Sequence, residues 1–144
     1  MPLASDIASL LDSGSTALTL NSNLFVNGLP DTTGRAVCVT DTVGLPAYEK
    51  FAGEKPAMTR PRAQVLARST ESVGGSGMPN PTNASVLIQD CWDLVVGVAN
   101  ETVNSVVYQR IEPLQDPYKL RIDEKGRTQF VFNVQATRTP TTQA

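Results

Sequence analysis

Three carboxylates in the middle of the chain are the first candidates for chemistry. Asp90 and Asp93 lie three residues apart, and Glu101 follows them. Residues at this spacing share one side of a helix, where paired carboxylates can act as acid and base or bind a metal. The sequence contains no His and offers no nucleophile beside them. We therefore interpret the group as a solvated helix face and expect no enzymatic activity.

Cys38 and Cys91 are the two cysteines of the chain. Zinc sites take three or four Cys and His ligands, so one subunit cannot build an ordinary one. A disulfide or a reactive thiol is the functional alternative. Because each cysteine lies in an apolar run, we interpret both as small buried hydrophobic residues. We expect no metal and no cofactor.

Glycines 74, 75 and 77 resemble a phosphate-binding loop only in composition. No Gly-Lys-Ser/Thr ending follows them, and no buried strand leads directly into them. The surrounding residues 70–81 contain two prolines as well, and we predict a long flexible loop there.

Arg60, Arg62 and Arg68 fall at even spacing in a run that alternates between apolar and polar residues. Even spacing in a strand places all three on one face. This basic stripe can pair with carboxylates of another chain or face DNA, or it can be a solvated sheet face. If it is functional, we favour salt bridges between subunits.

Length and charge restrict the class of protein. The 144 residues are 40% hydrophobic, which suits one domain, residues 1–144, with a single core. A net charge of −2 and a pI near 5.0 argue against a protein that binds nucleic acid by neutralising phosphates. We find no apolar run long enough to span a membrane and no signal-peptide pattern, so we expect synthesis in the cytoplasm and no membrane partner.

The expected elements are two helices and about four strands. Leu3, Ile7 and Leu11 mark one face of an opening helix that ends near Gly14. Strands are predicted at 36–39, 60–68, 103–111 and 128–137, and the principal helix at 82–99. We predict an α+β fold, in which an antiparallel sheet of about four strands carries helices on one face as a two-layer sandwich.

The loops and the principal helix supply further interface candidates. Residues 41–59 lose periodicity and form a long predicted loop with Tyr48 and Phe51 as anchors. The helix at 82–99 is apolar over most of its circumference, so we expect a second cover for it beside its own sheet. Trp92 and Asp93 on this helix are therefore candidates for a subunit contact, and residues 138–144 are a predicted flexible tail.

The last third of the chain is its most informative segment. Phe130, Phe132, Val134 and Ala136 alternate with Gln129, Val131, Asn133 and Gln135. This pattern predicts a half-buried antiparallel strand, which a charged turn introduces at residues 123–126. The segment carries no group that could perform catalysis, and it points to assembly.

Several short blocks together resemble bacteriophage minor capsid proteins that act as tail terminators, also called tail completion proteins. The blocks are Asn23-Leu24-Phe25, Gly28-Leu29-Pro30, Ala36-Val37-Cys38-Val39, the loop through Pro46, Arg60-Pro61-Arg62-Ala63-Gln64-Val65, the helix at 82–99, and Leu120-Arg121-Ile122-Asp123-Glu124-Lys125-Gly126-Arg127 with Phe130, Phe132 and Asn133. Their order and spacing, over about residues 3–138, carry the likeness. The chain departs from the pattern in its glycine-rich insertion at 74–77 and at 120–122, where a glycine often precedes the turn.

The resemblance implies a structural virion protein at the head–tail junction. Such a protein forms a ring, typically a hexamer, that caps the tail tube, stops its growth and docks to the head connector, while packaged DNA passes through without sequence-specific binding. The nearer alternative is a head-completion, stopper or neck adaptor protein on the portal side, which a DNA-facing stripe of Arg60, Arg62 and Arg68 would favour. A small enzyme or nucleic-acid module is the more distant alternative.

Overall fold

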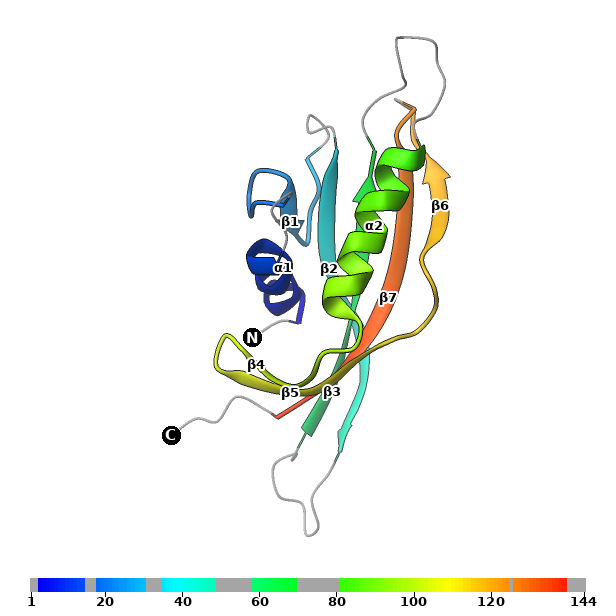
Figure 1. Cartoon of the computed structure of the whole chain (residues 1–144). Coiled ribbons are helices and arrows are strands. Elements are labelled where there is room, and N and C mark those ends of the chain that lie inside the picture. The colour runs from blue at the N-terminus through cyan, green and yellow to red at the C-terminus, as the bar shows by residue number, and fades with distance from the viewer. Residues whose placement is uncertain are drawn as a thin grey trace.

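The computed structural model describes residues 3–14, 18–30, 35–48, 58–69, 81–124 and 126–139. These residues form two helices and seven strands (Figure 1). In chain order the elements are α1 (Leu3–Gly14), β1 (Leu24–Val26), β2 (Ala36–Tyr48), β3 (Met58–Arg68), α2 (Pro81–Val95), β4 (Ala99–Val103), β5 (Val106–Pro113), β6 (Tyr118–Ile122) and β7 (Thr128–Arg138). Neither helix is long and apolar enough to cross a membrane.

The strands form one mixed sheet in the order β1-β2-β3-β7-β5-β4. β1 runs parallel to β2, and the other pairs are antiparallel. β7 is long enough to serve two neighbours on one edge: its C-terminal half pairs with β5 and its N-terminal half with β6. The sheet curls into a half-barrel, and the β4–β5 hairpin sweeps away from the end of β7 (Figure 1).

The predicted fold class was therefore wrong. In place of the predicted antiparallel sheet of about four strands, with helices on one face as a two-layer sandwich, the structure has a seven-stranded, mixed and curled sheet. Three strands were not expected as separate elements. β1 is only three residues long, β6 is exposed along its whole length, and β4 is joined to β5 by a turn within a predicted continuous run. None of these strands shows the alternation of buried residues that identifies a strand from sequence.

The core lies between the two helices and one face of the sheet. Leu3, Ile7 and Leu11 of α1 are almost fully buried, and α2 packs on β3 and β7. Beneath the helices, Val39, Val65 and Phe132 stand opposite one another on three adjacent strands. The alternation predicted for the last strand is confirmed, because Phe132, Val134 and Ala136 belong to this core.

The start of α1 depends on a residue from the sheet. The first amides of a helix lack partners within it. Here the Ala4 N–H donates to the Asp41 carboxylate at 2.9 Å. Asp41 is held in turn by Asn27, whose side-chain oxygen accepts from the Asp41 amide at 2.9 Å. The packing of α1 is thereby joined to β2 and to the segment that follows β1.

Several element boundaries differ from prediction. β2 continues to Tyr48 and β3 starts at Met58, so both ends of the loop predicted at 41–59 are strand, while 49–57 lie outside the described residues. α2 ends at Val95, before Gly97 with its positive φ of 95°. The loop at 70–81 falls outside the described residues except for Pro81, which begins α2, and so does the tail beyond Thr139.

Candidate functional site

The surface around β6 is built on a tightly fixed turn. Asp123 accepts two hydrogen bonds from Arg127, one from the backbone N–H at 3.0 Å and one from the guanidinium Nε at 2.7 Å. Gly126 has a φ of 76°, a left-handed conformation that glycine adopts without strain. Its N–H donates to the carbonyl of Asp123 at 3.0 Å. This turn fixes β6 beside β7.

β6 is an edge strand with an unusual amount of apolar surface. All five of its residues are exposed, and Tyr118, Leu120 and Ile122 have exposed fractions of 42%, 43% and 42%. Leu114, in the segment between β5 and β6, has an exposed fraction of 45%. Within the described part of the chain, β6 pairs with β7 alone. Apolar side chains clustered on an unpaired edge are typical of a surface that another protein covers.

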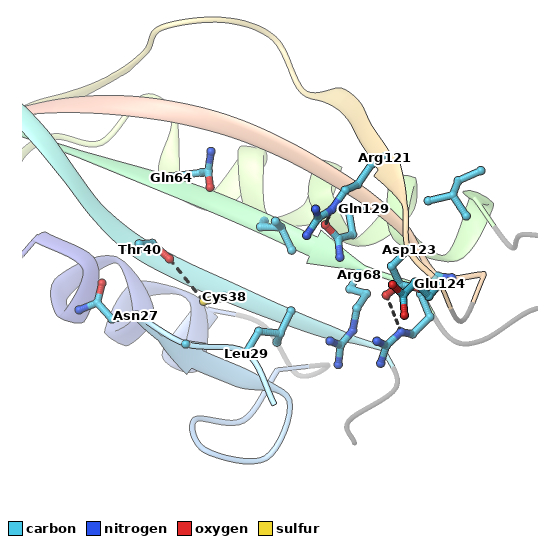
Figure 2. A pocket seen from close by; sticks show the side chains of 14 residues that line it. Asn27, Leu29, Cys38, Thr40, Gln64, Arg68, Arg121, Asp123, Glu124 and Gln129 are labelled. Atoms are coloured by element: carbon cyan, nitrogen blue, oxygen red, sulfur yellow. Dashed lines mark hydrogen bonds and ion pairs between the residues drawn. The ribbon is translucent and has the colours of Figure 1, made fainter. Parts of the chain in front are cut away.

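A groove of about 640 Å³ lies beside β6. Its floor is formed by residues of β2, β3 and β7 that alternate with the core residues, and so it lies on the face of the sheet away from the helices. Its walls come from residues 27–29 after β1 and from the segment 121–124. Figure 2 shows Cys38 and Thr40 on β2, Gln64 on β3, and Arg121 beside Gln129.

Charged groups gather at the turn end of the groove. Arg68 and Arg127 line it and are only 3% and 4% exposed. A buried guanidinium must be paired to be tolerated. The Nη2 of Arg68 donates to the Pro30 carbonyl at 2.9 Å, and Arg127 pairs with Asp123. Arg121 donates to the side chain of Gln129 at 3.0 Å. This end of the groove is thus a rigid set of hydrogen-bonded side chains.

The predicted basic stripe lies on the groove face of β3, but its arginines have unequal exposure. Arg60 and Arg62 are half-buried, whereas Arg68 is buried. The Nε of Arg62 donates to Gln135 on β7 at 3.2 Å. The alternating sequence pattern predicted that the three residues share one face of β3. The exposure of each side chain depends on the residues of the neighbouring strands.

The other predicted interface residues have different surroundings. Tyr48 ends β2, and Phe51 is outside the described residues. Trp92 is half-buried on α2, and its ring meets Phe132 edge-on with centroids 5.3 Å apart and planes at 76°. Asp93 is exposed and accepts a hydrogen bond from Gln89 at 3.1 Å. Trp92 thus contributes to the packing of its own subunit, while Asp93 remains on the surface.

A buried polar network joins α1 to the sheet, and sequence reasoning missed it. Asp6 is fully buried and accepts hydrogen bonds from the Tyr108 hydroxyl and from Asn104, the latter at 2.9 Å. Arg138 donates to the Tyr108 hydroxyl at 3.1 Å and lies 3.6 Å from the Asp6 carboxylate. Burial, with the hydrogen bond to Asp6, raises the pKa of Tyr108 above its ordinary value of 10.0, and Arg138 opposes the rise. Every group has a partner, so we interpret the network as structural.

Asp93 and Glu101, two of the first candidates for chemistry, are exposed and line the same shallow hollow at the junction of α2 with β4. Among the described residues, no group of three or more His, Cys, Asp or Glu lies together as a metal site. Cys38 and Cys91 are free and buried, as predicted. Burial raises the pKa of the Cys91 thiol from 9.0 to about 12, with Asp90 adding to the rise and Arg35 opposing it. A thiol with so high a pKa is a poor nucleophile near neutral pH.

No family model and no curated protein matches this chain. The geometry itself describes a binding surface: an exposed apolar edge strand, a groove lined by hydrogen-bond donors and acceptors, and a rigid turn between them. Such a surface can hold another protein by apolar contact and hydrogen bonds.

Proposed function

We propose that this chain is a structural virion protein at a phage head–tail junction. It forms a ring, which we take to be hexameric, that caps the tail tube, ends its growth and docks to the head connector. Packaged DNA passes through the ring without sequence-specific contacts. The protein acts by assembly and not as an enzyme.

The main support for the proposal is that two independent observations fall on the same segment. The block Leu120-Arg121-Ile122-Asp123-Glu124-Lys125-Gly126-Arg127, which resembles the closing segment of tail terminators, falls on the end of β6 and the turn that fixes it. The same segment bears part of the exposed apolar edge. The residues that suggested an assembly protein and the surface most suited to assembly are therefore the same part of the chain.

The composition of the edge supports a lasting protein contact. Tyr and Leu are effective contact residues because they bury much apolar area, and Tyr adds a polar group at its tip. A free soluble protein gains nothing from leaving three apolar side chains exposed on one strand at the open edge of a sheet, where they promote aggregation. A ring or tube contact would cover them.

The arginines favour the tail-terminator role over the portal-side stopper. A stopper with a DNA-facing stripe would need Arg60, Arg62 and Arg68 exposed together to meet phosphates. Arg68 is 3% exposed and bound to a carbonyl, and Arg62 is engaged by Gln135. Of this stripe, only the half-buried Arg60 and Arg62 expose charge that could meet phosphates.

The test is electron microscopy of lysates from a phage that carries this gene with an early stop codon. We expect tails of uncontrolled length, unattached to DNA-filled heads. Tails of normal length beside heads that leak DNA would replace the proposal with the stopper. Intact infectious particles would refute any role at the junction.

Complementation supplies the matched control. The intact gene expressed from a plasmid in the same host should restore tail length and attachment. If long tails persist despite complementation, the defect arises elsewhere in the genome, and the proposal loses its support.

A further inference from the structure

The sheet face that contains the groove beside β6 is arranged in rows. Residues that pair across neighbouring strands lie side by side on one face of a sheet. On the face away from the helices, the register places an apolar row between a row with two arginines and a row of uncharged polar side chains. The three rows are Cys38, Leu66 and Val131; Arg68, Gln129 and Arg121; and Thr40, Gln64 and Asn133.

The apolar row is accessible in the groove. Leu66 is half-buried on the floor, and Leu29 is half-buried in the wall. Tyr118 pairs with Val131 and continues the row to β6, where it is 42% exposed. Both helices pack on the opposite face, the side of Val65 and Phe132. The apolar row can therefore receive an apolar side chain from another molecule.

Arg121 carries a fixed positive charge at the border of this row. Its Nε donates to the side chain of Gln129 at 3.0 Å, and Gln129 is only 6% exposed (Figure 2). Arg121 itself is exposed, and no carboxylate in the described part of the chain pairs with it. Because Nε is engaged, the two Nη groups remain to donate a pair of parallel hydrogen bonds to one carboxylate or phosphate.

Lys119, the other cation of β6, lies on the opposite face of the sheet. It pairs with Phe130, which packs against the core beneath the helices. Arg121 pairs with Gln129, whose side chain lines the groove. One strand thus exposes two positive charges, and of these only Arg121 stands beside the apolar row.

The groove suits a carboxylate on a polypeptide better than the phosphates of DNA. Phosphate binding needs several accessible cations, whereas Arg68 and Arg127 are 3% and 4% exposed and Glu124 adds an exposed carboxylate to the wall. Thr40 and Gln64 lie in the groove, and such side chains both donate and accept, as the N–H and C=O groups of a peptide require. The volume of about 640 Å³ is in the range of ligand sites, about 300–1,000 Å³.

We propose that the groove binds an extended acidic segment of a partner protein. A carboxylate of that segment is held by the Nη groups of Arg121, and an adjacent apolar side chain packs on Leu66. The inference rests on the proposed function in one respect: the partner would be another protein of the head–tail junction.

Ligand-observed NMR with short synthetic peptides tests the site on the full-length protein. The probe is acetyl-Leu-Asp-Leu-amide, and its matched control is acetyl-Leu-Asn-Leu-amide, which keeps the shape and lacks the charge. At low salt the Asp peptide should bind about fivefold more tightly, within the range for an exposed charge pair. Equal binding of the two peptides, or no binding of either at millimolar concentration, would overturn the proposal.

Arg121→Gln and Lys119→Gln are matched variants, because each removes one exposed positive charge from β6. Arg121→Gln should reduce the preference for the Asp peptide to less than about twofold, while Lys119→Gln should leave it at about fivefold. Thermal melting should show that both variants remain folded. Equal losses in the two variants would show only a general attraction to the strand and would overturn the assignment to the groove.

Two further measurements address the charge and the apolar row separately. Glu124→Gln removes a negative charge from the wall and should tighten binding of the Asp peptide about twofold without affecting the Asn peptide. Replacing both leucines of the probe by alanine should weaken binding at least about threefold, because less apolar area is buried. An alanine peptide that binds as well as the leucine peptide would refute the contact with Leu66.

Duplex DNA serves as a competitor. DNA that displaces the Asp peptide from the parent protein, and fails to bind Arg121→Gln, would replace the peptide by a phosphate ligand and overturn the proposal. Failure of DNA to compete is the expected result.

The outcome separates this inference from the proposed function. Selective binding of the Asp peptide by a protein whose loss leaves infectious particles intact would keep the site and refute the junction role. Absence of peptide binding, with tails of uncontrolled length in the stop-codon phage, would refute the site and keep the role.

Discussion

Replacing Tyr108 by Phe should destabilise the protein by about 2 kcal/mol. The substitution keeps the buried ring and deletes one hydroxyl, which donates to Asp6 and accepts from Arg138 at 3.1 Å. Hydrogen bonds to charged groups contribute about 1.5–3 kcal/mol each. Asp6 retains Asn104 and Arg138 as partners, so the net loss should be below the sum and close to the contribution of a single such bond. In a domain of this size, a loss of about 2 kcal/mol lowers the melting temperature by about 6 °C.

Urea unfolding and thermal melting measure the effect, with Tyr118→Phe as the matched control. Tyr118 is 42% exposed, so loss of its hydroxyl should change the free energy of unfolding by less than about 0.5 kcal/mol. Combining Tyr108→Phe with Asp6→Asn should show coupling of about 1 kcal/mol or more. Equal effects of the two tyrosine substitutions would refute the interpretation of the network as structural. So would strict additivity of the losses in the free energy of unfolding for Tyr108→Phe and Asp6→Asn.

Three further predictions concern stability. The pKa of Cys91 is raised from 9.0 to about 12 in the folded protein, so its contribution to stability is complete below pH 9 and declines as the pH rises toward 12. The free energy of unfolding, measured in urea, should therefore fall between about pH 8 and pH 10, and Cys91→Ala should make that fall smaller by about 1 kcal/mol. Ser105→Gly should stabilise by about 0.5–1 kcal/mol, since Asn104 and Ser105 both have positive φ in the β4–β5 turn, and an unchanged or lower melting temperature would contradict this. Trp92→Ala should cost about 2 kcal/mol, because the half-buried ring loses its packing on Phe132, and a melting curve like that of the parent protein would show that the ring acts only in assembly.

The helices and long strands could be predicted because their residues alternate between core and surface. Leu3, Ile7 and Leu11 identify α1, and the period-two runs identify β3 and β7. These elements bury one face, and burial of one face is what a periodic sequence encodes. The number of strands and the curl of the sheet could not be obtained in the same way.

The missed strands lack a buried face of their own. β6 is exposed at all five positions, and its place is fixed by pairing with β7 and by the Asp123–Arg127 turn. The β4–β5 turn is formed by Asn104 and Ser105, where a glycine would have signalled a hairpin more strongly. Register and pairing between distant segments set the topology, and they leave little mark on local sequence.

The candidate site was predictable only in part. The segment from Leu120 to Arg127 was chosen from sequence, but its exposed apolar edge depends on which strand lies at the edge of the sheet. The burial of Arg68 and the network around Asp6 likewise depend on contacts between residues far apart in the chain. Such contacts become visible only in three dimensions.

A cryo-electron-microscopy reconstruction of the neck of a phage that carries this gene would test the central claim most directly. We predict a ring of copies of this half-barrel on the last layer of the tail tube, with β6 of each copy covered by a ring or tube contact. A neck whose density contains no copy of this fold would contradict the proposed function. A ring in which β6 faces solvent would contradict the interpretation of the β6 edge as a contact surface.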